Sequence, residues 1–128
     1  MTDSVPPDLA YHPAHGWARV DGDEATLGIT DHAQDELGEI VFWEVPEAGT
    51  PVRAGESYTE LESTKAVSDV IAPLSGEIVA VNDAIADTPE KINDDPYGDG
   101  WLVKIRLSNP GEAGELLSAD AYKESIGG

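Results

Sequence analysis

The 128-residue sequence contains no cysteine and very few basic residues. Without cysteine there is no disulfide framework, no thiolate metal site and no cysteine nucleophile. Seven lysines and arginines stand against 26 aspartates and glutamates, which gives a formal net charge of −19. Such a surface repels phosphate backbones and anionic lipid, so nucleic-acid binding and membrane-surface roles are disfavoured. The acids are spread along the chain, so the charge suits solvation as well as steering toward basic partner proteins.

Long apolar runs and targeting signals are also lacking. No run approaches the length that spans a bilayer. Residues 1–8 have neither the basic and apolar regions of a signal peptide nor the arginines of a transit peptide. We therefore expect a cytoplasmic protein. Its length suits one domain with its own core, so we expect a single domain over 1–128.

Glycine and proline are frequent, with 13 and 9 residues, and they favour many short strands over long helices. The stretches 17–20 and 25–29 alternate around a turn at Gly22, which predicts a hairpin. Further strands are expected over 39–45 and 101–107. The expected fold class is mainly β.

The helix signals are short. Thr30 or Asp31 is expected to cap a helix near 30–37, and the glycine that follows suits its left-handed end. A C-terminal helical region should begin at Asn109, whose side chain is expected to cap it. The segment 87–100, rich in proline, glycine, asparagine and aspartate, is expected to be a loop.

No catalytic set stands out in the sequence. The histidines His12, His15 and His32 lack HxH or HExxH spacing, so no metal site is expected. GxSxG, P-loop and GxGxxG motifs are absent. The stretch 94–101 lacks the alternating ligands of a calcium loop. We therefore do not expect an enzyme.

Lys65 lies at the centre of two mirrored strand-like stretches, in a hairpin core of about 39–83. Turn glycines stand ten residues before it, at Gly55, and eleven after it, at Gly76. An ordinary exposed turn lysine is the alternative, but the chain has only four lysines. A single lysine at a hairpin tip presents its amine to another protein, so covalent attachment is the favoured interpretation. Three neighbouring acids are candidates for recognition by the modifying enzyme: Glu60, Glu62 and Asp69.

Three sequence blocks resemble the H-protein family of the glycine cleavage system. They are GITDHAQDELG at 28–38, ESTKAVSD at 62–69 and NDDPYGDGW at 93–101. The resemblance covers about 11–122. It implies a barrel-sandwich hybrid of small antiparallel sheets, with lipoate in amide linkage to Lys65.

The resemblance also implies a non-catalytic carrier in a multienzyme system. Its lipoyl arm would take an aminomethyl group from glycine decarboxylase, the P-protein, to aminomethyltransferase, the T-protein. Dihydrolipoamide dehydrogenase, the L-protein, would reoxidise the arm, and a lipoate ligase or octanoyltransferase would attach it. A tethered arm raises the effective concentration of its cargo at each partner.

The position between His15 and Trp17 departs from the family pattern: the chain has Gly16 there, where the family commonly has glutamate. The resemblance implies that this glutamate holds the amine of the loaded arm in a cleft. We expect the cleft to include His15, with Asp69 as the substitute acid. Weaker protection of the arm is the second interpretation.

Of three other functional classes, one stays open and two are disfavoured. An H-like lipoyl protein that serves lipoate relay or another redox pathway is the main alternative, and the missing glutamate favours it. A biotin carrier is disfavoured, because Thr64 and Ala66 flank the lysine where biotin domains have methionines. Nothing in the sequence favours an unmodified structural domain.

Overall fold

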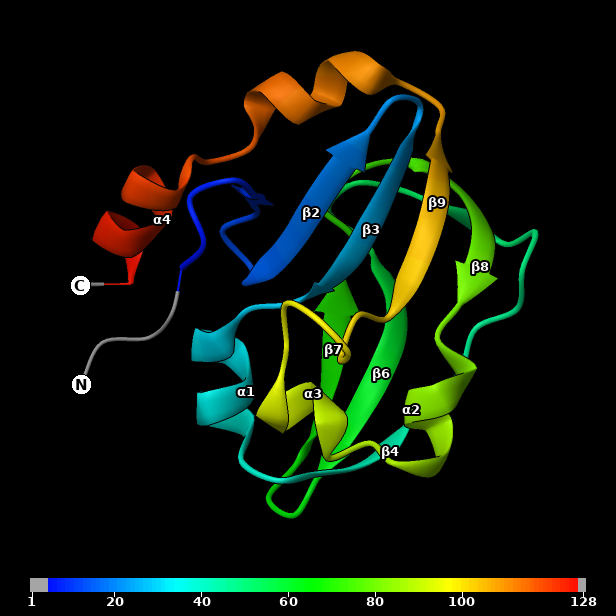
Figure 1. Cartoon of the computed structure of the whole chain (residues 1–128), viewed down its shortest axis with the longest axis vertical. Coiled ribbons are helices and arrows are strands. Elements are labelled where there is room, and N and C mark those ends of the chain that lie inside the picture. The colour runs from blue at the N-terminus through cyan, green and yellow to red at the C-terminus, as the bar shows by residue number, and fades with distance from the viewer. Residues whose placement is uncertain (1–4, 127–128) are drawn as a thin grey trace.

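The computed structural model describes residues 5–126. Residues 1–8 were expected to carry no targeting signal, and the first four of them lie outside the described part. Two antiparallel sheets make up its core (Figure 1). The larger sheet consists, in spatial order, of β1 (Ala10–Tyr11), β2 (Gly16–Asp21), β3 (Glu24–Ile29), β9 (Val103–Leu107), β8 (Gly76–Val81) and β5 (Pro51–Val52). The smaller sheet consists of β4 (Ile40–Trp43), β6 (Ser57–Ser63) and β7 (Val67–Ile71).

Buried apolar side chains from both sheets form one cluster between them. Leu27 and Ile105 come from the larger sheet, and Trp43 and Leu61 from the smaller; all four are at most 1% exposed. The alternation along these strands explains the arrangement, because every second side chain of a strand points to the same face. The mainly β, barrel-sandwich prediction is confirmed.

The helices are short and lie around the sheets (Figure 1). They are α1 (Asp31–Leu37), α2 (Asp83–Asp87), α3 (Lys91–Asp94), the 3₁₀ helix η1 (Pro110–Glu115) and α4 (Ala119–Ser125). Across the described residues, none of the helices has the length and apolarity that crossing a membrane requires.

Local sequence signals predicted several elements correctly. β2 and β3 form the predicted hairpin, with Asp21 opposite Glu24. Helix α1 begins after Thr30, whose hydroxyl accepts a hydrogen bond from the Ala33 N–H, and ends at Gly38 with a φ of 82°. A positive φ of this kind is one that glycine adopts without strain.

Two expectations about helices were wrong. The segment 87–100 is not only a loop, because it contains α3, and α2 precedes it. Each of these helices has a single buried isoleucine, Ile85 in α2 and Ile92 in α3, which is too little for a recognisable apolar period. The predicted C-terminal helical region is present, but the side chain of Asn109 makes no capping bond.

A second cluster, half of whose side chains are aromatic, joins the two terminal regions. Tyr11 and Trp17 pack with Tyr122 of α4, and all three are fully buried. The rings of Tyr11 and Tyr122 stack at 4.8 Å. Backbone bonds between Tyr11 and Leu117 pair the two regions. This contact places Tyr122 beside the start of β2, where His15 lies.

Candidate functional site

Lys65 lies in the exposed turn between β6 and β7, at the lower edge of the molecule in Figure 1. Ser63 shapes this turn: its hydroxyl accepts hydrogen bonds from the N–H groups of Lys65 and Ala66, both at 3.1 Å. The Ser63 N–H in turn donates to the Ala66 carbonyl at 2.8 Å. The turn is therefore satisfied by its own residues, a role typical of serine. The side chain of Lys65 extends from this fixed turn.

The segment 38–40, which links α1 to β4, fastens the turn to the body of the protein. The Thr64 N–H donates to the Glu39 carbonyl at 3.0 Å, which joins the turn to the residue before β4. The stem of Lys65 lies over Gly38, since a methyl group at Gly38 would be 2.9 Å from Lys65 Cε. Gly38 thus ends α1 and also leaves room for the lysine.

Asn93 of α3 holds this fastening segment in place. Its amide nitrogen donates to the Gly38 carbonyl at 2.8 Å and to Gln34 Oε1 at 2.9 Å. Its amide oxygen accepts from the Ile40 N–H at 2.8 Å. A single half-buried amide therefore links α3 to the end of α1 and the start of β4. Asn93 belongs to the 93–101 block, but its role was not predicted, because nothing local to it shows its partners.

The three predicted recognition acids lie on the outer face of the smaller sheet. Glu60 is directly opposite Asp69, and Glu62 is opposite Val67 on one side and Phe42 on the other. We call these five residues the outer face. Phe42 and Val67 are 51% and 57% exposed, large values for apolar side chains.

The acids of the outer face repel one another. Desolvation, followed by the neighbouring carboxylates of Glu44 and Asp69, raises the pKa of Glu60. Like charges directly opposite each other destabilise a sheet. The arrangement therefore costs stability, and a cationic partner would relieve that repulsion.

His15 lies at a cavity of about 150 Å³ between α1 and β7. Its lining includes Glu36 of α1 and Ser68 and Asp69 of β7. The cavity thus includes both predicted residues of the arm cleft, His15 and Asp69. The carboxylate of Asp69, however, lies 3.4 Å from the Ser57 hydroxyl, on the side of β6.

The backbone and ring of His15 are held by several contacts. Its φ is 72°, a conformation that non-glycine residues adopt rarely and usually at constrained positions. Its N–H donates to the His12 carbonyl, and its own carbonyl accepts from the Thr30 N–H at 3.0 Å. Its Nδ1 lies 2.8 Å from the hydroxyl of Tyr122. Burial, and then His32, lower the pKa of His15, whereas Glu36 acts in the opposite direction. The His15 ring is therefore neutral at neutral pH.

The Tyr122 hydroxyl also lies 2.7 Å from the hydroxyl of Thr30, which caps α1. The same hydroxyl thus connects α4, the start of α1 and the loop before β2. No local pattern indicates this link, since Tyr122 is 107 residues from His15.

The 93–101 block supports the same region from the other side. Trp17 Nε1 donates to the Pro96 carbonyl at 3.0 Å, and the Tyr97 hydroxyl accepts from the Asp31 N–H at 2.9 Å. The block therefore anchors β2 and the first turn of α1. Its role in this structure is to position the cavity.

Gly16, the departure from the family pattern, is buried and lines the cavity. A methyl group there would lie 3.1 Å from the Ile71 carbonyl oxygen. That contact is tight, so a larger residue requires a shift of a few tenths of an ångström between β2 and β7.

The chain matches the family model described as glycine cleavage H-protein over residues 9–127. It is 54% identical over 122 residues to a glycine cleavage system H protein of Rubrobacter xylanophilus, covering 95% of this chain and 94% of that one. It is 52% identical to a probable glycine cleavage system H protein of Haloarcula marismortui, covering 98% and 99%.

A solved structure agrees with these sequence matches. The crystal structure of a glycine cleavage system H protein from Mycobacterium marinum superposes with a TM-score of 0.88 at 45% identity. The superposition covers 96% of this chain and 99% of that one. The chain therefore belongs to the glycine cleavage H-protein family.

Proposed function

We propose that this chain is the lipoyl carrier of a glycine cleavage system, with lipoate in amide linkage to Lys65. One observation carries the proposal: the exposed amine at the tip of the β6–β7 hairpin, in a chain of the H-protein family. Residues of about 39–83 would form its lipoyl-type core, within one domain over 1–128. The chain would itself be non-catalytic.

The residues around Lys65 fit such an arm. The lysine is exposed, its stem lies over a glycine, and the hydroxyl of Ser63 bonds its backbone N–H. The turn thus stays in place while the amine is modified. When attached, the lipoyl group would supply the dithiolane that accepts the aminomethyl group and carries electrons. The protein's own residues present the arm and keep the platform rigid.

The proposed partners act on the arm in turn. They are glycine decarboxylase, aminomethyltransferase, dihydrolipoamide dehydrogenase and the lipoate ligase or octanoyltransferase that modifies Lys65. The net charge of −19 favours encounters with basic docking surfaces. The outer face adds two exposed apolar side chains beside three acids, so it suits a basic surface with an apolar centre.

The expected test is a reconstituted glycine assay. The lipoylated chain should restore exchange of bicarbonate into glycine by glycine decarboxylase, and the unmodified chain should not. Failure of the lipoylated chain with every partner present would contradict the glycine cleavage role.

Gly16 supports a second candidate, an H-like lipoyl protein that serves lipoate relay or another redox pathway. If the missing glutamate weakens protection of the arm, Gly16→Glu should slow the release of ammonia from the chain whose arm carries the aminomethyl group. The rate is measured after removal of the decarboxylase, with Gly16→Ala as the control for the tight contact at Ile71. An unchanged rate would mean that other residues close the cleft.

A further inference from the structure

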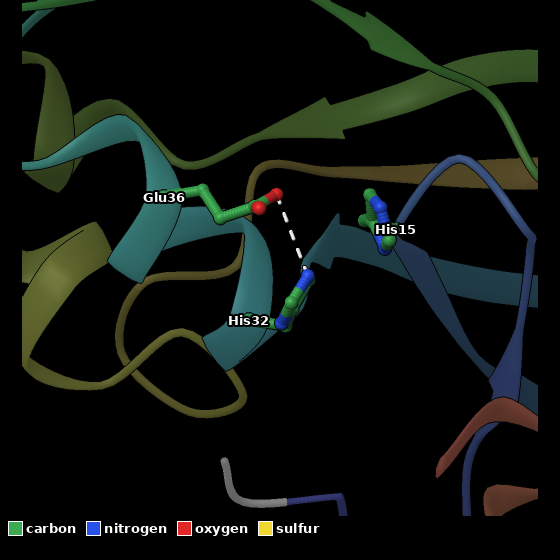
Figure 2. A group of neighbouring side chains, drawn as sticks. All are labelled: His15, His32 and Glu36. Atoms are coloured by element: carbon green, nitrogen blue, oxygen red, sulfur yellow. Dashed lines mark ion pairs between the residues drawn. The ribbon is translucent and has the colours of Figure 1, made fainter. Parts of the chain in front are cut away.

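Three side chains of metal-binding type meet beside the cavity: His15, His32 and Glu36. One potential ligand atom from each lies within 4.8 Å of those of the other two. Figure 2 shows His32 and Glu36 on successive turns of α1, with His15 facing them from the loop before β2. The three residues thus come from two elements, held together by the bond between Thr30 and His15.

The spacing is near that of a tetrahedral metal site. Ligand atoms at the usual zinc distances of about 2.0–2.1 Å lie roughly 3.3 Å apart in a tetrahedron. His32 Nε2 and Glu36 Oε1 are already 3.4 Å apart. The other separations, which are at most 4.8 Å, must close toward this value, and the Glu36 side chain is 63% exposed and can rotate.

An ordinary ion pair does not explain the position of His15. An i,i+4 contact on a helix accounts for His32 and Glu36 alone. The His15 ring lies 4.8 Å from the His32 ring, and its backbone is held at a φ of 72°. The Tyr122 hydroxyl bonds Nδ1, so Nε2 is the nitrogen left for a ligand. Such an outer partner is what orients the histidines of metal sites.

We propose that His15, His32 and Glu36 form a binding site for a divalent transition metal, with Zn²⁺ as its best occupant. Two imidazoles and one carboxylate are a known zinc ligand set, whereas Mg²⁺ and Ca²⁺ prefer oxygen ligands alone. The fourth position would open to the cavity at β7. This proposal replaces the expectation of no metal site, which considered only the linear spacing of the histidines.

The test uses the full, unlipoylated chain, so its outcome is independent of the carrier proposal. The chain is freed of metal with a chelator and titrated with Zn²⁺ in excess Mg²⁺, against a chromophoric competitor. We expect one Zn²⁺ per chain, and a visible Co²⁺ spectrum of four-coordinate type. Weak binding of several Zn²⁺ ions that excess Mg²⁺ abolishes would overturn the proposal, because the acidic surface alone accounts for it.

Matched variants locate the site. His32→Gln and Glu36→Gln should each weaken Zn²⁺ binding by at least about 10-fold, since even loss of an outer partner costs that much. Asp35→Asn removes an exposed charge from the same helix and should change binding less than about twofold. Equal losses in Glu36→Gln and Asp35→Asn would contradict the site.

The remaining histidines complete the series. His15→Asn is chosen because asparagine tolerates a positive φ, and it should lower Zn²⁺ affinity by at least about 10-fold. His12→Asn is its control, since an amide oxygen can still accept the bond from Ala14 that His12 Nδ1 now accepts. Circular dichroism verifies each fold, and His32→Gln and Glu36→Gln decide the proposal alone if His15→Asn unfolds. Undiminished affinity in these two variants would exclude the site.

Discussion

The turn at Lys65 and the cavity at His15 lie along the same strand, β7, yet they are built differently. The turn is exposed and is shaped mainly by Ser63, two residues before the lysine. The cavity is assembled from segments far apart in the sequence, with the Tyr122 hydroxyl as a central contact. The exposure of Lys65 thus depends on residues close to it in the chain, whereas the position of His15 in the cavity depends on long-range contacts.

This difference predicts separate consequences for the two regions. A change at the turn should alter modification and leave stability intact, because few long-range contacts depend on it. A change among the contacts that position α1 should lower stability first.

Lys65→Arg should abolish lipoylation completely, because guanidinium does not form the amide. Its free energy of unfolding should change by no more than about 0.5 kcal/mol, as for other exposed substitutions. Lys123→Arg, at an exposed lysine of α4, is the control and should be lipoylated normally. Modification is measured by intact mass and stability by urea denaturation. Carrier activity in the Lys65→Arg protein would refute the account of the turn.

Asn93→Ala should destabilise the chain by about 2–3 kcal/mol, because it removes three hydrogen bonds and leaves partly buried groups unpaired. Urea denaturation measures the loss. Asn109→Ala removes an exposed asparagine without a capping bond and should be nearly neutral. Similar values for the two variants would show that Asn93 does not hold the segment that fastens the turn.

Neutralising the outer face should slow lipoylation and raise stability together. Glu60→Gln with Asp69→Asn removes the directly opposed charges, so we expect a small rise in the free energy of unfolding. The kcat/KM of the ligase should fall, because charged groups at the rim of an interface mainly raise the rate of association. Glu124→Gln, in α4, is the control. An unchanged kcat/KM would remove these acids from recognition.

Gly38→Ala should cost about 1 kcal/mol, because alanine is strained at a φ of 82°. Gly55→Ala is a close match, with a φ of 86° and open space around it, and should cost the same. Only Gly38→Ala should also slow lipoylation, since its methyl group displaces the stem of Lys65. Equal lipoylation rates in both variants would show that the contact at Gly38 does not position the lysine.

The difference between local and long-range contacts also explains which features the sequence could predict. The β2–β3 hairpin, the Thr30 cap and the turn at Lys65 all depend on residues close together in the chain, and each was recognised. The partners of Asn93 and Tyr122 lie 53 to 107 residues away, so no local pattern indicated them. The meeting of His15 and His32 was hidden for the same reason: the fold, and not their spacing, brings them together.

The central claim is that Lys65 is the attachment point of a lipoyl arm. The most direct measurement is intact mass with peptide mapping after incubation with lipoate, ATP and a lipoate ligase. The account predicts one lipoyl increment, on the peptide that contains Lys65. A folded chain without any increment, or with the increment on another lysine, would contradict it.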